Sequence, residues 1–527
     1  MKHTDIIRKL NLEQKCALLS GETVFTTRAL PGKGIPSITL SDGPNGVRKQ
    51  AGAADHLGLN PSVPATCFPT SSATACSWDE ALGEAVGEAM GEEAAAQEVA
   101  VLLGPGLNIQ RSPLCGRDFE YFSEDPILAG KMAAAYVRGI QKNGISACPK
   151  HFAVNSQELR RMASDSVVDE RTLRELYLTG FEIVVKEARP KTIMTSYNLI
   201  NGTYANENAH LLQDILRKDW GFDGAVVTDW GGSNDHALGV KNGSTLEMPC
   251  PGGDSIRELM KAVKDGKVTE ADLDVRLDEL LELVLSTHAA VEKAPRTFDA
   301  AAHHALARRA AAESIVLLKN EDGILPLKAG EKLAVIGDFA QTPRYQGAGS
   351  SAVNALQVDA LLDCIKADDS GISFVGYASG FDRQGAADPK KQEEAVSLAK
   401  QADTVLLCLG LDELRESEGL DRADMALAEN QQQLLDAVAA VNPNVVVLLS
   451  AGAPVETPWV GRCKALVYGA LGGQAGAGAA ADILTGKLCP CGKLSQTWAK
   501  AHDDTPAKAN FGGEGRNVEY REGLYVG

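Results

Sequence analysis

Short apolar runs alternate with longer stretches of helical pattern between about residues 35 and 295. This alternation is typical of repeated βα units around a parallel sheet. The expected strands are the runs ITL (38–40), VLLG (101–104), ISAC (145–148), TIMTSY (192–197) and GAVVTD (224–229). The first part of the chain therefore predicts an α/β fold with parallel strands.

Polar residues end or follow each of these expected strands. In a (β/α)8 barrel the carboxyl ends of the strands open on the active-site face. The residues that would converge there are Asp42, Asn108, Lys150, Tyr197 and Asp229. Their convergence is the first indication of a functional site.

A second series of expected strands follows residues 285–312, a polar, Ala-rich stretch typical of a linker that leads into a helix. These strands are KLAVIGD (332–338), TVLLCLG (404–410), NVVVLLS (444–450) and KALVYGA (464–470). Continuous apolar runs are typical of strands that are buried on both faces. Because helix-like segments separate them, they predict a second α/β domain. A chain of 527 residues also exceeds what one hydrophobic core usually supports.

The formal charge of −18 limits the binding partners. It repels phosphate backbones and anionic lipid headgroups, so neither nucleic acid nor a membrane is expected as the main partner. The amino-terminal sequence does not have the pattern of a signal peptide, and no apolar run is long enough to span a membrane. The 11 cysteines are irregularly spaced, which favours free thiols in a reducing compartment. We therefore expect a cytoplasmic protein.

Two further patterns in the sequence could indicate a bound cofactor or metal. The Gly-rich stretches GAGSS (347–351) and GGQAGAG (472–478) match neither a P-loop nor a dinucleotide-binding fingerprint. Cys489 and Cys491 have no second Cys or His pair at a spacing suited to metal binding. No cofactor and no metal are expected.

Several segments combine carboxylates, cations and aromatic rings, a composition that suits an uncharged polyhydroxylated ligand. Asp229 followed by Trp230 would place an anion beside an indole face, although an aspartate at a strand end is more often a helix cap or a structural ion pair. A salt-bridged loop would equally explain GRDFEYFSEDP (116–126). A solvated acidic loop would explain DELRESEGLDR (412–422). For the histidine of KHFAVN (150–155), a core position and a ligand contact are equally compatible with the sequence.

Taken together and in this order, these segments resemble glycoside hydrolase family 3, in its β-glucosidase branch. The resemblance covers nearly the whole chain. The matching stretches are SDGPNGVR (41–48), LGPGLNIQRSPLCGRDFEYFSEDP (103–126), KHFAVNSQELRRM (150–162), MTSYNLINGTY (194–204), WGFDGAVVTDW (220–230) and RESEGLDR (415–422). Matches in this number and order are highly specific, unlike any one of them.

The resemblance implies an N-terminal (β/α)8-like TIM barrel followed by an α/β sandwich domain with a mostly parallel sheet. The active site would lie between the two domains. We expect the barrel at residues 1–290, a linker with the helix leading into the second domain at 291–330, the sandwich at 331–500 and a linker-like tail at 501–527. Many relatives continue past GLYVG into a fibronectin-III-like domain, so the chain is expected to be either a natural short form or one that lacks this domain.

Carried over residue by residue, the resemblance makes Asp229 the nucleophile and Glu418 the acid/base, with Glu416 as its nearest competitor. The other implied site residues hold the glycone, line the pocket wall or lie near the leaving group: Asp42, Arg117, Lys150, His151, Arg161, Met194, Tyr197, Trp230 and Ser351, or its neighbour Ser350. A retaining double displacement requires the two carboxyl groups to lie about 5 Å apart. It also requires an ionised Asp229 and a raised pKa for Glu418, so that this residue arrives protonated.

The resemblance implies a retaining, exo-acting β-glucosidase that removes terminal glucose from oligosaccharides or glucosides without a cofactor. Asp42 would accept hydrogen bonds from a hydroxymethyl or neighbouring hydroxyl group, which favours glucose over xylose. The alternatives are a β-xylosidase or α-L-arabinofuranosidase with the same machinery, and a catalytically silent sugar-binding protein. The N-acetylglucosaminidase branch is not expected, because KHFAVNSQE (150–158) does not have the Gly-rich loop of that branch. The partner would be a small carbohydrate or glucoside, and association into a homo-oligomer stays open.

Overall fold

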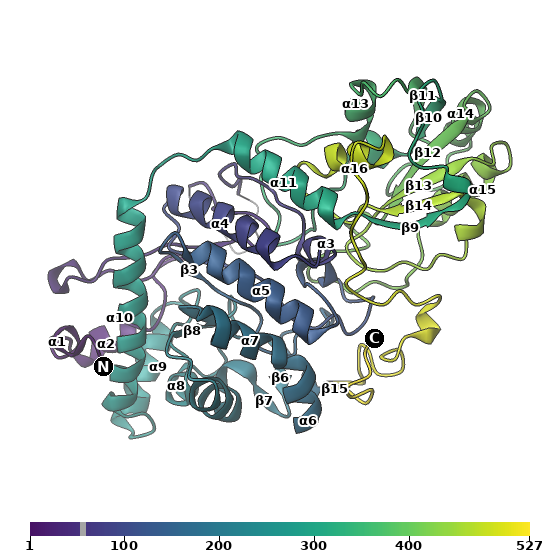
Figure 1. The fold of residues 1–527 in the computed structure, drawn as a ribbon. Coiled ribbons are helices and arrows are strands. Elements are labelled where there is room, and N and C mark those ends of the chain that lie inside the picture. Colours follow the sequence, from purple (N-terminus) through teal and green to yellow (C-terminus); the bar gives the residue numbers. More distant parts are fainter. Residues whose placement is uncertain (53–59) are drawn as a thin grey trace.

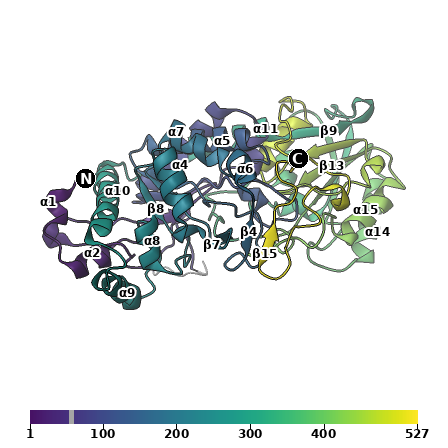
Figure 2. The same cartoon turned by 90° about the horizontal axis from the view of Figure 1, so that it is seen from below.

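The computed structural model describes residues 1–52 and 60–527, and it contains two α/β domains that lie side by side (Figure 1). The view from below shows the same arrangement, with the last part of the chain lying near the boundary between the domains (Figure 2). In the described residues, no helix is both long enough and apolar enough to cross a membrane.

Parallel strands form the centre of the first domain, as the alternating pattern predicts. They are β1 (Leu40–Asp42), β2 (Val101–Leu103), β3 (Ser146–Ala147), β5 (Thr192–Met194) and β8 (Ala225–Val227). The strands β1, β2 and β3 pair in parallel, as do β5 and β8, and a parallel bridge between Phe152 and Thr195 joins the two groups. The ring continues through residues 246–247 and closes through residues 20–27, which bridge to the segment before β1. The result is an irregular TIM-like barrel.

Helices cover the outside of this barrel (Figure 1). They are α1 (Thr4–Ile7), α2 (Leu12–Leu18), α3 (Ser71–Ala75), α4 (Glu80–Ala96), α5 (Pro126–Gln141), α6 (Glu170–Thr172), α7 (Thr179–Ala188), α8 (His236–Asn242), α9 (Gly253–Lys264) and α10 (Glu270–Lys293), with a π-helical segment, η5 (His210–Asp219), between β5 and β8. The two long helices α4 and α5 begin at Asp79 and Asp125, whose carboxylates accept hydrogen bonds from backbone N–H groups of the first turn. Such caps satisfy donors that the helix itself leaves unpaired.

Glycines allow α4 and α5 to pack backbone against backbone. A Cβ atom at Gly139 would lie 2.1 Å from the carbonyl oxygen of Glu84, and one at Gly87 would lie 2.5 Å from that of Tyr136. Any larger residue would therefore push the two helices apart.

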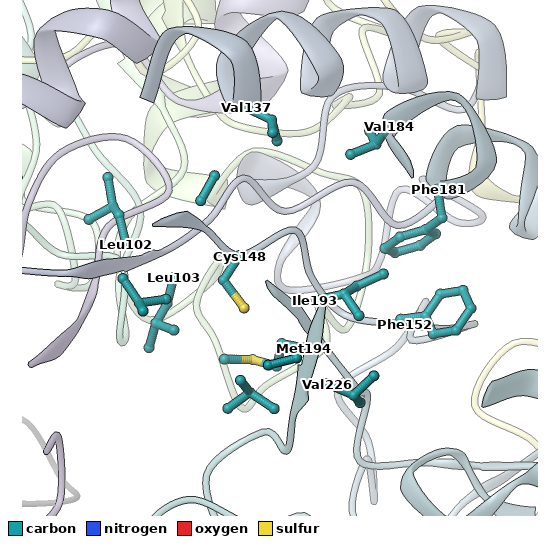
Figure 3. Packing of buried hydrophobic residues seen from close by; sticks show 14 of the residues in the cluster. Leu102, Leu103, Val137, Cys148, Phe152, Phe181, Val184, Ile193, Met194 and Val226 are labelled. Atoms are coloured by element: carbon teal, nitrogen blue, oxygen red, sulfur yellow. The ribbon is translucent and has the colours of Figure 1, made fainter. Parts of the chain in front are cut away.

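Apolar side chains fill the space between the strands and this helical layer (Figure 3). Val137 of α5 and Val184 of α7 are both completely buried. Below them, the rings of Phe152 and Phe181 meet edge to face with their centroids 5.2 Å apart. This core fixes the strand ends on which the site residues sit.

The second domain is built on a six-stranded sheet in the order β11-β10-β12-β13-β14-β9. Its strands are β9 (Val316–Asn320), β10 (Lys332–Ile336), β11 (Ser373–Ala378), β12 (Thr404–Gly410), β13 (Val445–Ser450) and β14 (Ala465–Tyr468), and only β9 is antiparallel to its neighbour. Its helices are α11 (Ala300–Ser314), α12 (Asp338–Gln341), α13 (Leu361–Lys366), α14 (Pro389–Ala399), α15 (Glu429–Ala439) and α16 (Gly476–Leu484). The strand β12 is buried along its whole length, which agrees with its continuous apolar run.

Two strands of this sheet were not predicted. The strand β9 lies in the segment expected to hold only the linker and the helix that leads into the second domain, and β11 lies between two predicted strands. Both are edge strands, and most of their residues are only partly buried. An edge strand that is covered on fewer sides does not need the continuous apolar run that identifies a central one.

The tail beyond residue 500 returns to the barrel, although we expected a linker-like segment. Its strand β15 (Asn517–Glu519) pairs in parallel with β4 (Asp165–Val167), in a sheet that also holds β6 (Leu199–Ile200) and β7 (Thr203–Tyr204). Glu522 forms a buried ion pair with Arg111, whose guanidinium lies 3.8 Å from the centroid of the Tyr520 ring. The sequence shows no apolar periodicity here because a short added strand and one ion pair hold the segment.

We predict that Glu522→Ala lowers the free energy of unfolding by ~3–5 kcal/mol, because Arg111 would keep a buried charge without its partner. Glu519→Ala is the matched control, because Glu519 pairs with Arg521 at the surface, where its side chain is 44% exposed compared with 3% for Glu522. Loss of such a surface pair costs about 0–1 kcal/mol. Urea unfolding of both variants measures the difference, and equal effects would contradict a stabilising role for the tail.

Candidate active site

A cavity of about 670 Å³ lies where loops of the second domain meet the barrel. The barrel lines it with Phe25, Asp42, Arg48, Gln50, Arg117, Lys150, His151, Arg161, Met194, Tyr197, Asp229 and Trp230, and the second domain with Gly349, Ser350, Ala352 and Glu418. Every barrel residue that the family resemblance implied for the site is in this set.

Asp229 follows β8 at the carboxyl end of the barrel strands. Its Oδ1 accepts a hydrogen bond of 2.7 Å from the backbone N–H of Trp230. Its Oδ2 is buried and has no hydrogen-bond partner among the described residues. Burial raises the pKa of Asp229, whereas the charges of Arg117, Arg161 and Lys150 oppose this rise. Asp229 lines the cavity, and its Oδ2 is not engaged in a hydrogen bond with another described residue.

His151 lies beside Asp229 as a neutral ring. Burial lowers its pKa well below the usual range, and the nearby cations Arg117 and Lys150 lower it further. Its Nε2 is 3.7 Å from Asp229 Oδ2. Asn108, which was expected at the strand ends, does not line the cavity but holds the backbone of His151 through two hydrogen bonds of 2.7 and 2.9 Å.

Two buried cations share a carboxylate that the sequence analysis did not single out, Glu120. Arg117 donates two hydrogen bonds to it, and the Lys150 ammonium lies 3.2 Å from its Oε1. Burial acts to raise the pKa of Glu120, but Arg117 and Lys150 outweigh it and lower the pKa. Burial likewise opposes the charged form of Lys150, whose pKa is nevertheless raised by Glu120 and Asp42. The spacing of Glu120 three residues after Arg117 in the GRDFE motif is the signal that could have identified it.

Asp42 extends from the end of β1 into the same cavity. Burial raises its pKa to about 6, although Lys150 lowers it. Its Oδ2 lies 3.9 Å from a guanidinium nitrogen of Arg48, a residue within the SDGPNGVR motif that was not predicted for the site. These charged groups can bind sugar hydroxyls as donors and acceptors.

Aromatic rings form one wall of the cavity. The indole N–H of Trp230 donates to the carbonyl of Val24 at 2.7 Å, and its ring lies 5.3 Å from that of Phe25. The hydroxyl of Tyr197 donates to the carbonyl of Trp230 at 2.9 Å, and the Arg161 guanidinium lies 5.1 Å from the Tyr197 ring centroid. No pattern in the sequence marks Phe25, because it belongs to the irregular segment that closes the barrel.

Glu418 enters the cavity from the second domain. Its Oε1 accepts a hydrogen bond of 2.9 Å from Arg161 and lies 3.6 Å from Arg117. Its Oε2 accepts hydrogen bonds of 2.6 Å from both the backbone N–H and the hydroxyl of Ser350. Burial acts to raise the pKa of Glu418, but these cations and hydrogen bonds outweigh the effect of burial and lower the pKa.

This lowered pKa corrects the expectation that Glu418 has a raised one. In the free site Glu418 is ionised, because two guanidinium groups and two donors from Ser350 stabilise its charged form. Protonation of Glu418 would therefore have to overcome this stabilisation.

The second domain also corrects the choice of serine. Ser350, and not Ser351, lines the cavity and binds Glu418, whereas Ser351 is buried with only 2% of its surface exposed. Gly349 has a φ of +119°, and a Cβ atom at this position would lie 2.4 Å from that of Glu418. The loop can therefore approach Glu418 closely enough for Ser350 to bind it only because residue 349 is glycine.

Glu416 has a structural position away from the cavity. It is completely buried, with Arg344 donating to its Oε2 at 2.7 Å and the backbone N–H of Gly452 donating to both carboxylate oxygens. Of the two candidate glutamates, only Glu418 lines the cavity.

Within residues 1–52 and 60–527, no group of three or more His, Cys, Asp or Glu side chains is arranged to hold a metal ion. Cys489 and Cys491 are exposed free thiols.

A TIM-like barrel whose cavity receives one carboxylate from its own strand end and another from a second domain has the arrangement of a glycoside hydrolase. The comparisons with known proteins agree. Residues 53–283 match the glycosyl hydrolase family 3 N terminal domain, and residues 315–527 match the glycosyl hydrolase family 3 C-terminal domain. The chain belongs to glycoside hydrolase family 3 and is a glycoside hydrolase.

Relatives align over nearly the whole chain. The chain is 46% identical to thermostable beta-glucosidase B of Acetivibrio thermocellus, with 99% of this chain and 69% of the relative covered. It is 44% identical to an exo-alpha-(1->6)-L-arabinopyranosidase of Bifidobacterium breve, with 99% of this chain and 70% of the relative covered. Among solved structures, the GH3 beta-glucosidase of Bifidobacterium adolescentis superposes with a TM-score of 0.93 at 43% identity, covering 99% of this chain and 75% of the other.

We predict that Glu416→Ala lowers the free energy of unfolding by ~3–5 kcal/mol, because Arg344 would lose its buried partner. Glu418→Ala should cost only about 1 kcal/mol, because Glu418 is partly exposed and Arg117 and Arg161 keep Glu120 and Glu158 as partners. Urea unfolding followed by circular dichroism compares the two variants. A larger destabilisation by Glu418→Ala would contradict the assignment of Glu416 as the structural residue.

Proposed function

We propose that this family 3 enzyme is a retaining, exo-acting β-glucosidase. The observation that carries the proposal is the meeting of Asp229, with its unpartnered Oδ2, and Glu418 in one cavity. Buried residues such as Lys150, His151 and Met194 line this cavity on the barrel side, which favours binding of a terminal sugar unit over an extended chain. The relatives named as beta-glucosidases support a glucose-like glycone.

In the first step, a carboxylate oxygen of Asp229 attacks the anomeric carbon as the bond to the leaving oxygen breaks. Glu418 donates a proton to that oxygen, and the products are a glycosyl ester on Asp229 and a free alcohol. Arg117, Lys150 and Asp42 hold the glycone hydroxyls, and the indole of Trp230 provides an apolar face for the ring. Arg117, Arg161 and Lys150 favour the ionised form of Asp229, which is the form that attacks.

In the second step, ionised Glu418 removes a proton from water while the water oxygen attacks the anomeric carbon. The ester bond breaks, Asp229 leaves as a carboxylate, and the sugar is released with its original β configuration. The position of Ser350 on Glu418 suits this step, because both of its hydrogen bonds stabilise the ionised base.

We predict that Asp229→Ala lowers kcat for nitrophenyl β-glucoside by at least ~10³-fold, because the nucleophile is lost. Azide should restore turnover by entering the vacated space, and NMR should identify the product as α-glucosyl azide. Near-wild-type turnover in the variant would contradict the assignment of the nucleophile, and a β-glucosyl azide would contradict its position.

A second candidate function is that of an arabinopyranosidase, since the similarity to exo-alpha-(1->6)-L-arabinopyranosidases extends over 99% of this chain. An α-L-arabinopyranoside has no exocyclic hydroxymethyl group, so an acceptor such as Asp42 would lose one hydrogen bond. We expect kcat/KM to favour nitrophenyl β-glucoside over the α-L-arabinopyranoside, β-xyloside and α-L-arabinofuranoside by about 10-fold or more. The reverse order for the arabinopyranoside would replace the glucosidase proposal with this second candidate.

A further inference from the structure

Glu158 is a further carboxylate beside the cavity, in the loop between β3 and β4, and its side chain is only 1% exposed. Its Oε2 accepts hydrogen bonds from Arg161 at 2.7 Å and from the backbone N–H of Gly419 at 2.8 Å. Its Oε1 is buried and has no hydrogen-bond partner among the described residues. Glu158 is thus in direct contact with the residue that follows Glu418.

Arg161 connects Glu158 to Glu418. The same Nη1 that donates to Glu158 Oε2 also lies 2.9 Å from Glu418 Oε1. The two carboxylate oxygens are therefore within two hydrogen-bond lengths of each other. One guanidinium nitrogen is thus shared by a buried acid of the barrel and a partly buried acid of the second domain.

Glu158 and Glu418 face the same two cations, so neither carboxylate has a cation of its own. The groups facing Glu158 are the cations Arg117 and Arg161, the acids Glu418 and Asp421, which accepts from the Glu158 backbone N–H, and the uncharged Tyr121 and Cys115. Burial raises the pKa of Glu158 to about 7, and the charge of Glu418 raises it as well, while the two arginines oppose this. Two like charges in a shared buried site favour retention of one proton by the pair.

We propose that Glu158 and Glu418, which accept from the same nitrogen of Arg161, hold one proton between them, and that this proton resides on Glu158 in the free enzyme. The donation step uses the other one-proton form of the pair, in which Glu418 carries the proton and Glu158 is a carboxylate against Arg161. Arg161 remains a guanidinium and does not carry the proton; the two forms exchange through water, as Glu158 releases its proton to water and Glu418 takes one from water. After hydrolysis, the proton that Glu418 takes from the attacking water restores the one-proton state of the pair. Glu158 acts through Glu418 and is a positioning residue; the inference rests on the proposed acid/base role of Glu418.

This arrangement explains how Glu418 can act as an acid although its pKa is lowered in the free site. A lone Glu418 between two arginines and Ser350 would lose its proton far below neutral pH. When Glu158 is ionised, it competes with Glu418 for Arg161, and this removes part of the stabilisation of ionised Glu418. The pair as a whole then keeps a proton up to the pH at which Glu158 titrates, about 7.

The test is the pH dependence of kcat/KM for Glu158→Gln, a variant of the same shape that cannot exchange a proton. With phenyl β-glucoside, a poor leaving group that needs acid assistance, we expect the alkaline limb near pH 7 of the wild type to move down by at least ~1 pH unit. With dinitrophenyl β-glucoside, which needs no proton, kcat/KM should change by less than about 3-fold. Glu279→Gln is the matched control, because Glu279 is a buried, ion-paired acid of the same barrel outside the cavity.

An unchanged alkaline limb, or equal losses with both leaving groups, would overturn the proposal in favour of a purely structural role. Infrared difference spectra of the wild type across neutral pH give an independent readout without turnover. They should show a buried carboxylic acid titrating near pH 7 that is missing from the spectra of Glu158→Gln, which separates it from Asp42, whose pKa is raised to about 6; its absence from the wild type, or its persistence in the variant, would also overturn the proposal. Failure of the wild type to hydrolyse either glucoside would reject the proposed function, whereas these spectra would still decide whether the pair shares a proton.

Discussion

The contact between the barrel and the loop that carries Glu418 (residues 412–422) is the interaction on which the site depends. Asp421 accepts hydrogen bonds from the backbone N–H groups of Gly116, Glu158 and Leu159, and Glu158 accepts one from Gly419 in return. Each domain thus provides an acceptor for buried donors of the other. Because an unpaired buried charge is costly, these reciprocal bonds fix how the two domains dock.

That docking explains how two carboxylates from separate cores reach one cavity. Asp229 is fixed by β8 and by the hydrogen bond from Trp230, whereas Glu418 is fixed by Ser350 and Arg161. Glu416 holds the start of the same loop inside the second domain through Arg344. The loop is therefore anchored to its own domain at one end and to the barrel at the other.

The expected site residues and the central strands could be predicted because they lie in dense motifs or continuous apolar runs. The buried runs of β12 and β13 required no knowledge of their neighbours, since a strand covered on both faces must be apolar throughout. The edge strands β9 and β11 and the tail strand β15 could not be predicted in this way, because partners far away in the sequence determine their pairing. Phe25 and Glu120 likewise became site residues only through the segments that they contact.

By itself, the sequence determined the α/β class, the succession of two domains and four strand-end residues that line the cavity, Asp42, Lys150, Tyr197 and Asp229. It did so because burial imposes a local pattern on each strand, and because polar residues at strand ends have a common direction in a parallel barrel. Only the tertiary structure decided which serine binds Glu418, which glutamate of the acidic loop reaches the cavity, and that Glu418 is ionised in the free site. These properties depend on distances between charges of two separately folded domains, and the pKa of a buried acid follows from those neighbours and not from its position in the chain.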